Sequence, residues 1–468
     1  MTTLESLAPS IQASMEKWAV PGMAIGVLTA DGVEAVAFGV RDLETGEPVT
    51  TETIFGIGSI SKVFTATLAA RLADQGRLDL DAPINDVLPD EDIPASISAN
   101  PVTLRHLLTH TSGLAGDGFA DHGGDDHALR DYIRSLHGIE LVFAPGEGWS
   151  YANTGSCIAG HVMACAEGET YEHLIRTQVL DPMNLTRTGF GQAPLPDDVA
   201  TGYDHGPGED PAPRPAGTTW RSANPAGGMN STVGDLLRFA AVHMGDGTIR
   251  GQRFMGADRL RDMQREQARL TTIDTWGLGW ARRVSGGRQL VEHGGWMDGY
   301  RAQLTLIPDT GGAIAILNNG GYGHAANEEI LVLLLEHLFG VAREAPKAIR
   351  LDRDLLRAYA GRYTSSHIDV AFRVDGDQLR ARYTTAWHEN DGADIALDPV
   401  TTEEFIIRDG EFEDSRVVFL PALREDTMAL RFLNRVLFRQ PEIAQEAEAL
   451  RSGASPVASP RAPESQSA

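Results

Sequence analysis

Ser59 and Lys62 lie three positions apart in the segment Phe55-Gly-Ile-Gly-Ser59-Ile-Ser-Lys62. The segment is rich in glycine before Ser59, and a helix is predicted to begin directly after these glycines. Residues at this spacing share one helix face, so the Lys62 amine can lie beside the Ser59 hydroxyl. A serine becomes a good nucleophile when a nearby base takes its proton, and the positive end of the helix favours the negative charge that develops. The pair indicates nucleophilic catalysis, with a chance pattern on an amphipathic helix as the alternative.

Lysine is rare in this chain and occurs at Lys17, Lys62 and Lys347, while arginine supplies most of the positive charge. Arginine keeps its proton in proteins, whereas lysine can lose it in suitable surroundings. A lysine at position 62 therefore favours a role in proton transfer.

Tyr151 and Asn153 form a second candidate pair, in a loop that precedes a predicted helix. The reference pKa values of a phenol and a lysine amine are similar, about 10 and 10.4, so Tyr151 and Lys62 can share a proton. One would take it from the serine while the other returns it to a leaving group. The Asn153 amide would hold the lysine or a substrate carbonyl. The alternative is a turn tyrosine followed by an asparagine that caps the helix.

His293, Gly294 and Gly295 lie late on a predicted strand. Glycines weaken a strand unless something must approach its backbone closely, and a substrate along this strand would explain them. The backbone N–H of Trp296 would then pair with that of Ser59 as an oxyanion hole. His293 would assist Tyr151 or the substrate, with a buried histidine at a hairpin edge as the alternative.

Taken in order, these motifs resemble the serine β-lactamase and penicillin-binding-protein-like superfamily, in particular its class C β-lactamase-like, D-aminopeptidase and esterase branch. The resemblance spans about residues 5–340, with familiar flanking segments at Leu107–Leu114, Phe143–Glu147 and Pro225–Asp235. It implies that Ser59 is the acylated nucleophile, that Lys62 and Tyr151 are the general base and acid, and that Asn153 binds substrate. The Ser59 and Trp296 amides would form the oxyanion hole, and no metal or cofactor is expected.

His293 departs from the β-lactamase pattern, in which a lysine begins the corresponding Lys-Thr/Ser-Gly triplet and helps to hold the drug carboxylate. A largely neutral histidine would hold that carboxylate less well. The resemblance therefore favours esterases, D-aminopeptidases and penicillin-binding-protein-type thioesterases. We expect hydrolysis of a small ester or peptide-like amide through an acyl-Ser59 intermediate. Acyl transfer or peptide cyclisation from the same intermediate, β-lactam hydrolysis and a non-catalytic sensor of acyl ligands stay open as alternatives.

The elements that would position these residues predict an α+β fold. A hairpin at Gly22–Gly39 opens the domain, helical patterns fill the middle, and strands from about residue 275 with a helix at Asn327–Phe339 close it. The natural arrangement is one antiparallel sheet, with its first and last strands adjacent, packed against a helical subdomain. This catalytic domain would span residues 1–342.

The period of the pattern changes beyond a predicted linker at 343–350. Short, evenly spaced strands over 351–440 predict a small antiparallel β-barrel, and its start at Tyr359–Tyr363 resembles the lipocalin-like barrels appended to the same branch. Residues 441–468 are rich in Ser, Pro, Ala and Glu and predict a disordered tail.

Composition limits the partners. The formal net charge of −25 disfavours nucleic acid and anionic lipid, and neither a signal peptide nor an apolar run long enough for a membrane span is predicted. The residue types in Asp121–His127 could bind metal, but their spacing matches no known site and indicates a solvated loop.

Cys157 and Cys165 would lie about 12 Å apart on a helix, too far for a disulfide. Reduced thiols fit a cytoplasmic protein with a small-molecule substrate, and a homo-oligomer is allowed.

Overall fold

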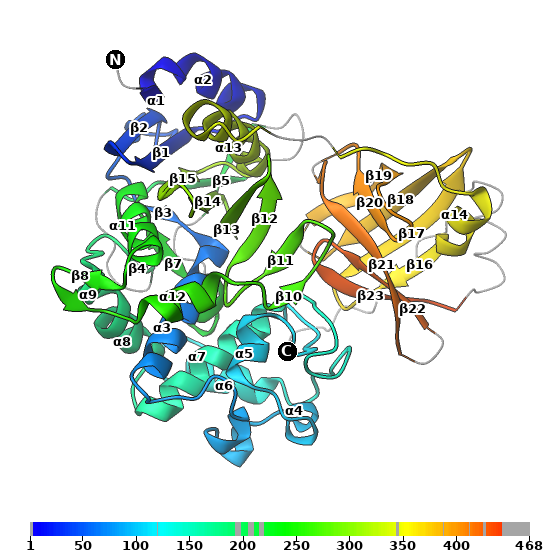
Figure 1. Cartoon of the computed structure of the whole chain (residues 1–468), viewed down its shortest axis with the longest axis horizontal. Helices are drawn as coiled ribbons and strands as arrows, with labels where there is room; N and C mark the ends of the chain where they lie inside the picture. Colours follow the sequence, from blue (N-terminus) through cyan, green and yellow to red (C-terminus); the bar gives the residue numbers. More distant parts are fainter. Residues whose placement is uncertain are drawn as a thin grey trace, which may run out of the picture. The chain divides into compact units, whose positions relative to one another are not determined.

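The computed structural model describes residues 3–118, 120–191, 198–204, 210–214, 220–342, 346–386, 388–410, 412–424 and 427–441. The chain divides into two compact units, Met1–Ala345 and Pro346–Ala468 (Figure 1). This division falls inside the segment predicted as a linker. Apart from residue 441, the predicted disordered tail lies outside the described residues.

An antiparallel sheet organises the described part of the first unit, in the order β10-β11-β12-β13-β14-β15-β1-β2 (Figure 1). The first and last long strands, β1 and β15, are neighbours, as the sequence predicts, and Ile25 lies opposite Ile316. The strands are β1 (Gly22–Thr29), β2 (Gly32–Gly39), β10 (Ala268–Arg269), β11 (Asp274–Trp276), β12 (Ala281–Ser285), β13 (Arg288–Met297), β14 (Tyr300–Ile307) and β15 (Gly312–Asn318).

Two turns in this sheet test the strand predictions. The hairpin of β1 and β2 closes with Thr29 opposite Gly32, and Gly32 has a φ of +125°, a conformation that suits glycine. The predicted strand from residue 276 to 284 is instead two strands, β11 and β12. Gly279 lies in the turn between them at a φ of +76°, where an added Cβ would lie 2.5 Å from the Cβ of Ala66. Close packing on the neighbouring helix and the positive φ therefore both require glycine at position 279.

Helices cover both faces of the sheet. On one face, alternate residues of β1 such as Ile25 join an apolar cluster with Ile11 of α2 and Leu334 of α13. On the other face, Ala24 belongs to the larger core that includes Val63 and Phe64 of α3. The bounds are α1 (Thr3–Ser6), α2 (Ala8–Lys17), α3 (Ser61–Asp74), α11 (Val233–Met244) and α13 (Gly323–Phe339).

The helical subdomain lies between β2 and β10 in the sequence. Thr103 caps α5, since its hydroxyl accepts a hydrogen bond from the His106 N–H at 3.2 Å. The helix α8 continues as a π-helical segment, η4. The helices are η2 (Ile84–Asp86), η3 (Asp90–Asp92), α4 (Ala95–Ala99), α5 (Leu104–Leu108), α6 (Ala128–Ser135), α7 (Asn153–Glu167), α8 (Tyr171–Ile175), η4 (Arg176–Leu180), α9 (Asp181–Met183), η5 (Arg221–Ala223), α10 (Asn224–Gly227) and α12 (Ala257–Gln264).

A small sheet of three strands, ordered β3-β7-β4, supports the segment that leads to Ser59. Phe55 of β3 pairs with Ser231 of β7, so the chain enters the helix start from a fixed strand. The bounds are β3 (Phe55–Gly56), η1 (Gly58–Ile60), β4 (Gly189–Phe190) and β7 (Met229–Ser231). Short ribbons pair β5 (Gly202–Asp204) with β6 (Ala212–Arg214) and β8 (Thr248–Ile249) with β9 (Gln252–Arg253).

In the second unit the described strands form a closed antiparallel barrel, which confirms the barrel prediction. Buried aromatic residues, among them Tyr363, Phe372 and Phe432, fill its core. The strand β19 was not predicted from the sequence, because its polar segment Glu389–Gly392 consists of residues with low strand propensity. The elements are α14 (Arg353–Tyr359), β16 (Gly361–Thr364), β17 (Ile368–Asp375), β18 (Gln378–Thr385), β19 (His388–Pro399), β20 (Glu404–Ile407), β21 (Arg416–Arg424), β22 (Thr427–Phe432) and β23 (Arg435–Arg439).

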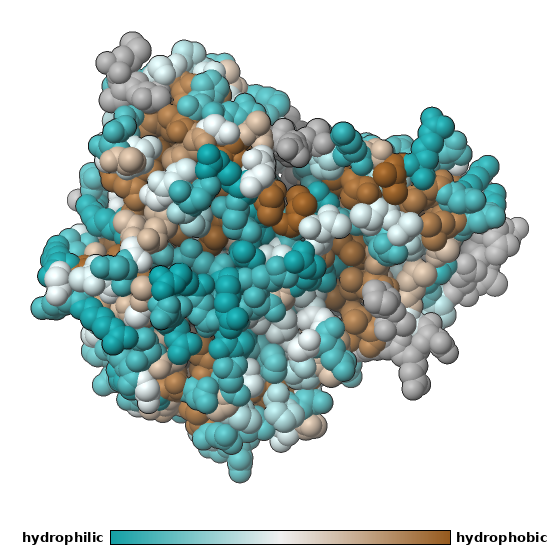
Figure 2. Space-filling model, viewed as in Figure 1, coloured by the Kyte–Doolittle hydropathy of each residue, from teal (hydrophilic) through white to brown (hydrophobic). Residues whose placement is uncertain are grey.

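The surface of the first unit carries many charged side chains. Figure 2 shows a hydrophilic band across it in the region of α12, where Arg261 pairs with Asp258 and Arg265 with Asp262. Among the described residues, no helix combines the length and the apolar character needed to cross a membrane.

Candidate active site

Ser59 lies in the turn η1, directly before α3. Gly58 precedes it with a φ of +47°, a conformation that disfavours residues with a Cβ. The Ser61 hydroxyl fixes this turn, because it donates to the Gly58 carbonyl at 2.7 Å and accepts from the Met229 N–H at 3.1 Å. Ser59 is therefore held at the N-terminal end of a buried helix, with part of its surface open.

Lys62 lies one turn further along, as the sequence spacing predicts. Its Nζ is 3.0 Å from the Ser59 Oγ and donates a hydrogen bond to the Ala226 carbonyl at 2.5 Å. The lysine is only 2% exposed. A neutral amine held in this way can turn its lone pair toward the Ser59 hydroxyl and accept its proton.

The segment that holds Lys62 is itself fixed. The Thr65 hydroxyl donates to the Pro225 carbonyl at 2.7 Å, and the Asn224 amide donates to Glu172 at 2.7 Å. Gly228 leaves room for Asn224, because a Cβ at Gly228 would lie 2.1 Å from the Asn224 Oδ1. These contacts give the segment Pro225–Asp235, singled out in the sequence, a physical role in placing the Lys62 amine.

Tyr151 lies in the loop before α7 and is buried against aromatic rings. The Lys62 Nζ is 4.9 Å from the centroid of its ring, and the rings of His110 and Trp276 are 4.3 and 5.9 Å away. The His110 Nδ1 accepts a hydrogen bond from the Ala152 N–H at 3.2 Å, which fastens the same loop. Tyr151 and Lys62 are thus brought together, as expected.

His110 and Trp276 were missed as site residues. The ring of His110 packs against that of Tyr151. The available signal was its place in the segment Leu107–Leu114. Its left-handed backbone, with a φ of +59°, is unusual for a residue other than glycine and is visible only in the structure.

His293 lies on β13, with its ring centroid 6.4 Å from that of Tyr151. Burial, helped by the positive charge of Lys62, lowers the pKa of His293 to about 3, so its imidazole is neutral at ordinary pH. Nδ1 carries the hydrogen, because it lies 2.6 Å from the Gly294 carbonyl, which can only accept. Nε2 is then an acceptor, and among the described residues it has no hydrogen-bond partner.

The two glycines after His293 have different surroundings. A Cβ at Gly295 would lie 1.9 Å from the Ile57 carbonyl oxygen, so the chain's own backbone, rather than a substrate, requires this glycine. At Gly294 the nearest atom to an added Cβ is the Gln303 Oε1 at 3.3 Å, and the residue is exposed. The Ile57 carbonyl therefore explains the glycine at position 295, and substrate binding along Gly294 and Gly295 stays a prediction.

The predicted oxyanion-hole donors belong to backbone segments that touch. A Cβ at Gly58 would lie 2.5 Å from the Trp296 nitrogen, which places the Trp296 peptide directly beside the residue that precedes Ser59. The Trp296 side chain is 41% exposed. The amides of Ser59 and Trp296 stay our prediction for the oxyanion hole.

Asn153 is the first residue of α7, and the residue at the cap position is Ala152, so the capping alternative is wrong. The Asn153 side-chain amide donates to the Asp117 Oδ1 at 2.6 Å. Asp117 is buried and was missed in the sequence, where nothing near it suggested a partner 36 residues away. Its contact leaves Asn153 one amide hydrogen and the carbonyl oxygen to contact Lys62 or a substrate.

A partly open serine at the start of a helix lies in contact with a buried lysine, and a tyrosine packs against that lysine. This arrangement, on a helix that packs against an antiparallel sheet, defines a serine hydrolase of the acyl-enzyme type. The chain belongs to the beta-lactamase family, whose model, described as Beta-lactamase, matches residues 7–338. The resemblance inferred from the motifs is thereby confirmed.

Three relatives illustrate the range of this family. The chain is 33% identical to penicillin-binding protein 4 of Amycolatopsis lactamdurans over 339 residues, which cover 69% of this chain and 87% of that protein. It is 30% identical to esterase EstB of Burkholderia gladioli over 304 residues, 58% of this chain and 75% of the relative. The octameric penicillin-binding protein homologue from Pyrococcus abyssi matches with a TM-score of 0.64 at 25% identity and covers 94% of this chain and all of the homologue.

Proposed function

We propose that this protein hydrolyses a small ester or a peptide-like amide through an acyl-Ser59 intermediate. The single observation that carries the proposal is the 3.0 Å contact between the Lys62 Nζ and the Ser59 Oγ. It supplies a nucleophile and a base in hydrogen-bond contact, at a helix end where negative charge is favoured.

In the proposed reaction the Ser59 oxygen attacks the substrate carbonyl carbon while its proton moves to the neutral amine of Lys62, which passes a proton on to the leaving group directly or through the Tyr151 phenol. The carbonyl oxygen becomes negative and is stabilised by the amides of Ser59 and Trp296. The bond to the leaving group then breaks, and that group takes up the proton. Water attacks the resulting ester in the same way, which releases the acid and returns a proton to Ser59.

The neutral imidazole of His293 supports a substrate that has no carboxylate beside this residue. Its imidazole is neutral because burial lowers its pKa to about 3, so it adds no positive charge to the site. A β-lactam drug carries a carboxylate that such a site would hold poorly. The similarity to an esterase supports the same preference.

Hydrolysis of p-nitrophenyl acetate and butyrate, beside a p-nitroanilide of a D-amino acid, tests the proposal. We expect turnover of at least one of these substrates by the native protein and none by Ser59→Ala. Ser10→Ala, which changes an exposed serine of α2, is the matched control and should keep full activity. Equal rates for Ser59→Ala and the native protein would show that the nucleophile is another residue.

Two further proposals concern the state of the protein in its cell. The octameric homologue from Pyrococcus abyssi supports self-association of this chain, which sedimentation velocity would measure.

The thiols of Cys157 and Cys165 are both free, which supports a reducing compartment such as the cytoplasm. Fractionation of the native cells with an antibody against the chain would test the location.

A further inference from the structure

Asp92, His161 and Cys165 form a compact group of potential metal ligands away from Ser59. The His161 Nε2 lies 2.9 Å from the Asp92 Oδ2 and 3.6 Å from the Cys165 Sγ. One ligand atom from each residue lies within 4.8 Å of the other two. Asp92 and His161 are buried, and Cys165 is half-buried. A single ring nitrogen thus faces both a carboxylate oxygen and a sulfur.

The fold assembles this group from two segments. His161 and Cys165 are four positions apart on α7, a spacing that places two ligands on one helix face. Asp92 ends η3 and reaches them from 69 residues earlier in the chain. The Arg134 Nε donates to the Asp92 Oδ1 at 2.5 Å, so it orients the carboxylate and leaves Oδ2 directed at His161. Hydrogen-bonded partners of this kind commonly orient metal-binding carboxylates.

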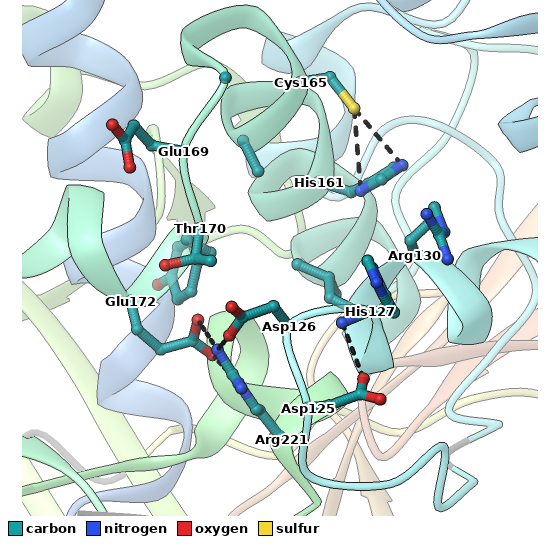
Figure 3. Close-up of a pocket in the computed structure, with 14 residues that line it drawn as sticks. Asp125, Asp126, His127, Arg130, His161, Cys165, Glu169, Thr170, Glu172 and Arg221 are labelled. Carbon is teal, nitrogen blue, oxygen red and sulfur yellow. Dashed lines mark hydrogen bonds and ion pairs between the residues drawn. The ribbon is translucent and has the colours of Figure 1, made fainter.

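A pocket of about 460 Å³ adjoins the group and has His161 and Cys165 in its wall. In Figure 3 these two side chains face each other at one end of the pocket, while Arg221 lies near Asp126 and Glu172 at the other. Arg221 is paired with those two acidic residues, and Arg130 pairs with Asp131. The pocket therefore offers a path from solvent and space for a water ligand, and each of its two arginines has a carboxylate partner.

We propose that Asp92, His161 and Cys165 bind one divalent transition-metal ion of the zinc type. Zinc takes thiolate, imidazole and carboxylate ligands at about 2.0–2.3 Å in tetrahedral geometry, which separates ligand atoms by about 3.4 Å. The Sγ–Nε2 distance of 3.6 Å already fits. As the ion binds, the imidazole proton shifts from Nε2 to Nδ1, and the separation between Asp92 and His161 would widen slightly from 2.9 Å. A thiolate with an imidazole selects against Mg²⁺ and Ca²⁺, which prefer oxygen ligands.

Metal binding at this group would also stabilise the protein. As the ion binds, the Cys165 thiol releases its proton to solvent and forms the metal–sulfur bond, while water from the pocket takes the fourth position. The ion would join η3 to α7, the helix that begins at Asn153 beside Tyr151. Because the unfolded chain lacks the assembled ligands, binding stabilises the folded state. The site is separate from the proposed hydrolytic chemistry and survives if that proposal fails.

Cobalt(II) gives a direct test, because a cobalt–thiolate bond absorbs by charge transfer in the near ultraviolet. We would titrate the untagged, chelator-treated full chain with Co²⁺ and then displace it with Zn²⁺. The expected result is saturation at one equivalent of Co²⁺, loss of the band on addition of Zn²⁺, and a higher melting temperature with Zn²⁺ than with Mg²⁺. No charge-transfer band with the native protein would overturn the proposal.

The chain has two cysteines, so the sulfur ligand can be assigned without ambiguity. Cys165→Ser should abolish the band, while Cys157→Ala, which removes the other thiol from the same helix, should keep it. His161→Gln and Asp92→Asn should each weaken Co²⁺ binding by about tenfold or more. Circular dichroism and ester hydrolysis would check that each variant is folded. A band that persists in Cys165→Ser and disappears in Cys157→Ala would refute the assignment.

Discussion

The carbonyl oxygen of Ile57 lies directly over Gly295, so close that a methyl group on Gly295 would sit 1.9 Å from it. The contact is reciprocal, because Gly58 presses against the peptide of Trp296 in the same way. Two glycines far apart in the sequence therefore let the turn before Ser59 dock on β13. This docking fixes the distance between the two amides that we assign to the oxyanion hole.

Gly295→Ala should separate the turn from β13, because neither backbone can absorb such a clash without moving. A displacement of about 1 Å in an active site can reduce activity on the order of 100-fold, and we expect a loss of that size in kcat/KM for p-nitrophenyl butyrate. Gly138→Ala is the matched control, since this residue is exposed and no atom lies within 4 Å of a Cβ added there. Equal losses in the two variants would show that the Ile57 contact does not set the catalytic geometry.

Lys62→Arg should nearly abolish activity although it keeps the positive charge. Arginine cannot accept the Ser59 proton, and loss of a general base typically costs about 100- to 10,000-fold in rate. Lys17→Arg is the control, because Lys17 is largely exposed and pairs with Glu329, a contact that arginine can keep. Steady-state kinetics would check both, and an active Lys62→Arg variant would exclude Lys62 as the base.

Tyr151→Phe should remove the phenol and keep the ring contacts with His110 and Trp276. If the phenol transfers a proton, kcat should fall by about 100-fold or more while the melting temperature stays close to that of the native protein. Tyr359→Phe, in the second unit, removes a phenol that donates to the Thr402 carbonyl and should leave kcat unchanged. A Tyr151→Phe variant with native kcat would limit Tyr151 to packing.

Stability should fall in acid in part because of His243. Burial lowers the pKa of His243 to about 3, whereas the unfolded chain binds this proton near pH 6.5. The unfolded state therefore gains protons that the folded state does not, and the free energy of unfolding decreases as the pH falls from about 6.5 toward 3. Urea unfolding at pH 7 and pH 5 would measure the effect.

Between these two pH values the native protein should lose about 2 kcal/mol more than His243→Gln, whose amide can keep the contact with Thr67. The same loss in both proteins would mean that His243 is not held neutral by burial.

The sequence was informative where the chemistry is local or the pattern is regular. The spacing of Ser59 and Lys62 gives their contact directly, because three positions on a helix have one geometry. The Asp31-Gly32 turn gives the first hairpin and its register. The antiparallel sheet with its first and last strands adjacent follows from the order of the elements.

Residues that reach the site from elsewhere in the chain could not be predicted in this way. Asp117 and His110 lie 36 and 42 residues before their partners in the loop that begins α7, and the meeting of Asp92 with His161 depends on how η3 packs. The sequence indicated a close backbone approach at Gly295, and the fold shows that the Ile57 carbonyl makes one such approach. The sequence shows that a glycine has no side chain, and only the fold shows which atoms occupy the space beside it.

Covalent labelling of Ser59 tests the central claim most directly. The native protein and Ser59→Ala would be incubated with a fluorophosphonate, and the modified residue would be located by fragmentation of the peptide Asp42–Lys62. We predict one adduct on the Ser59 oxygen of the native protein, none on the buried Ser61 of the same peptide, and none in the variant. A native protein without an adduct, or an adduct that persists in Ser59→Ala, would contradict the account.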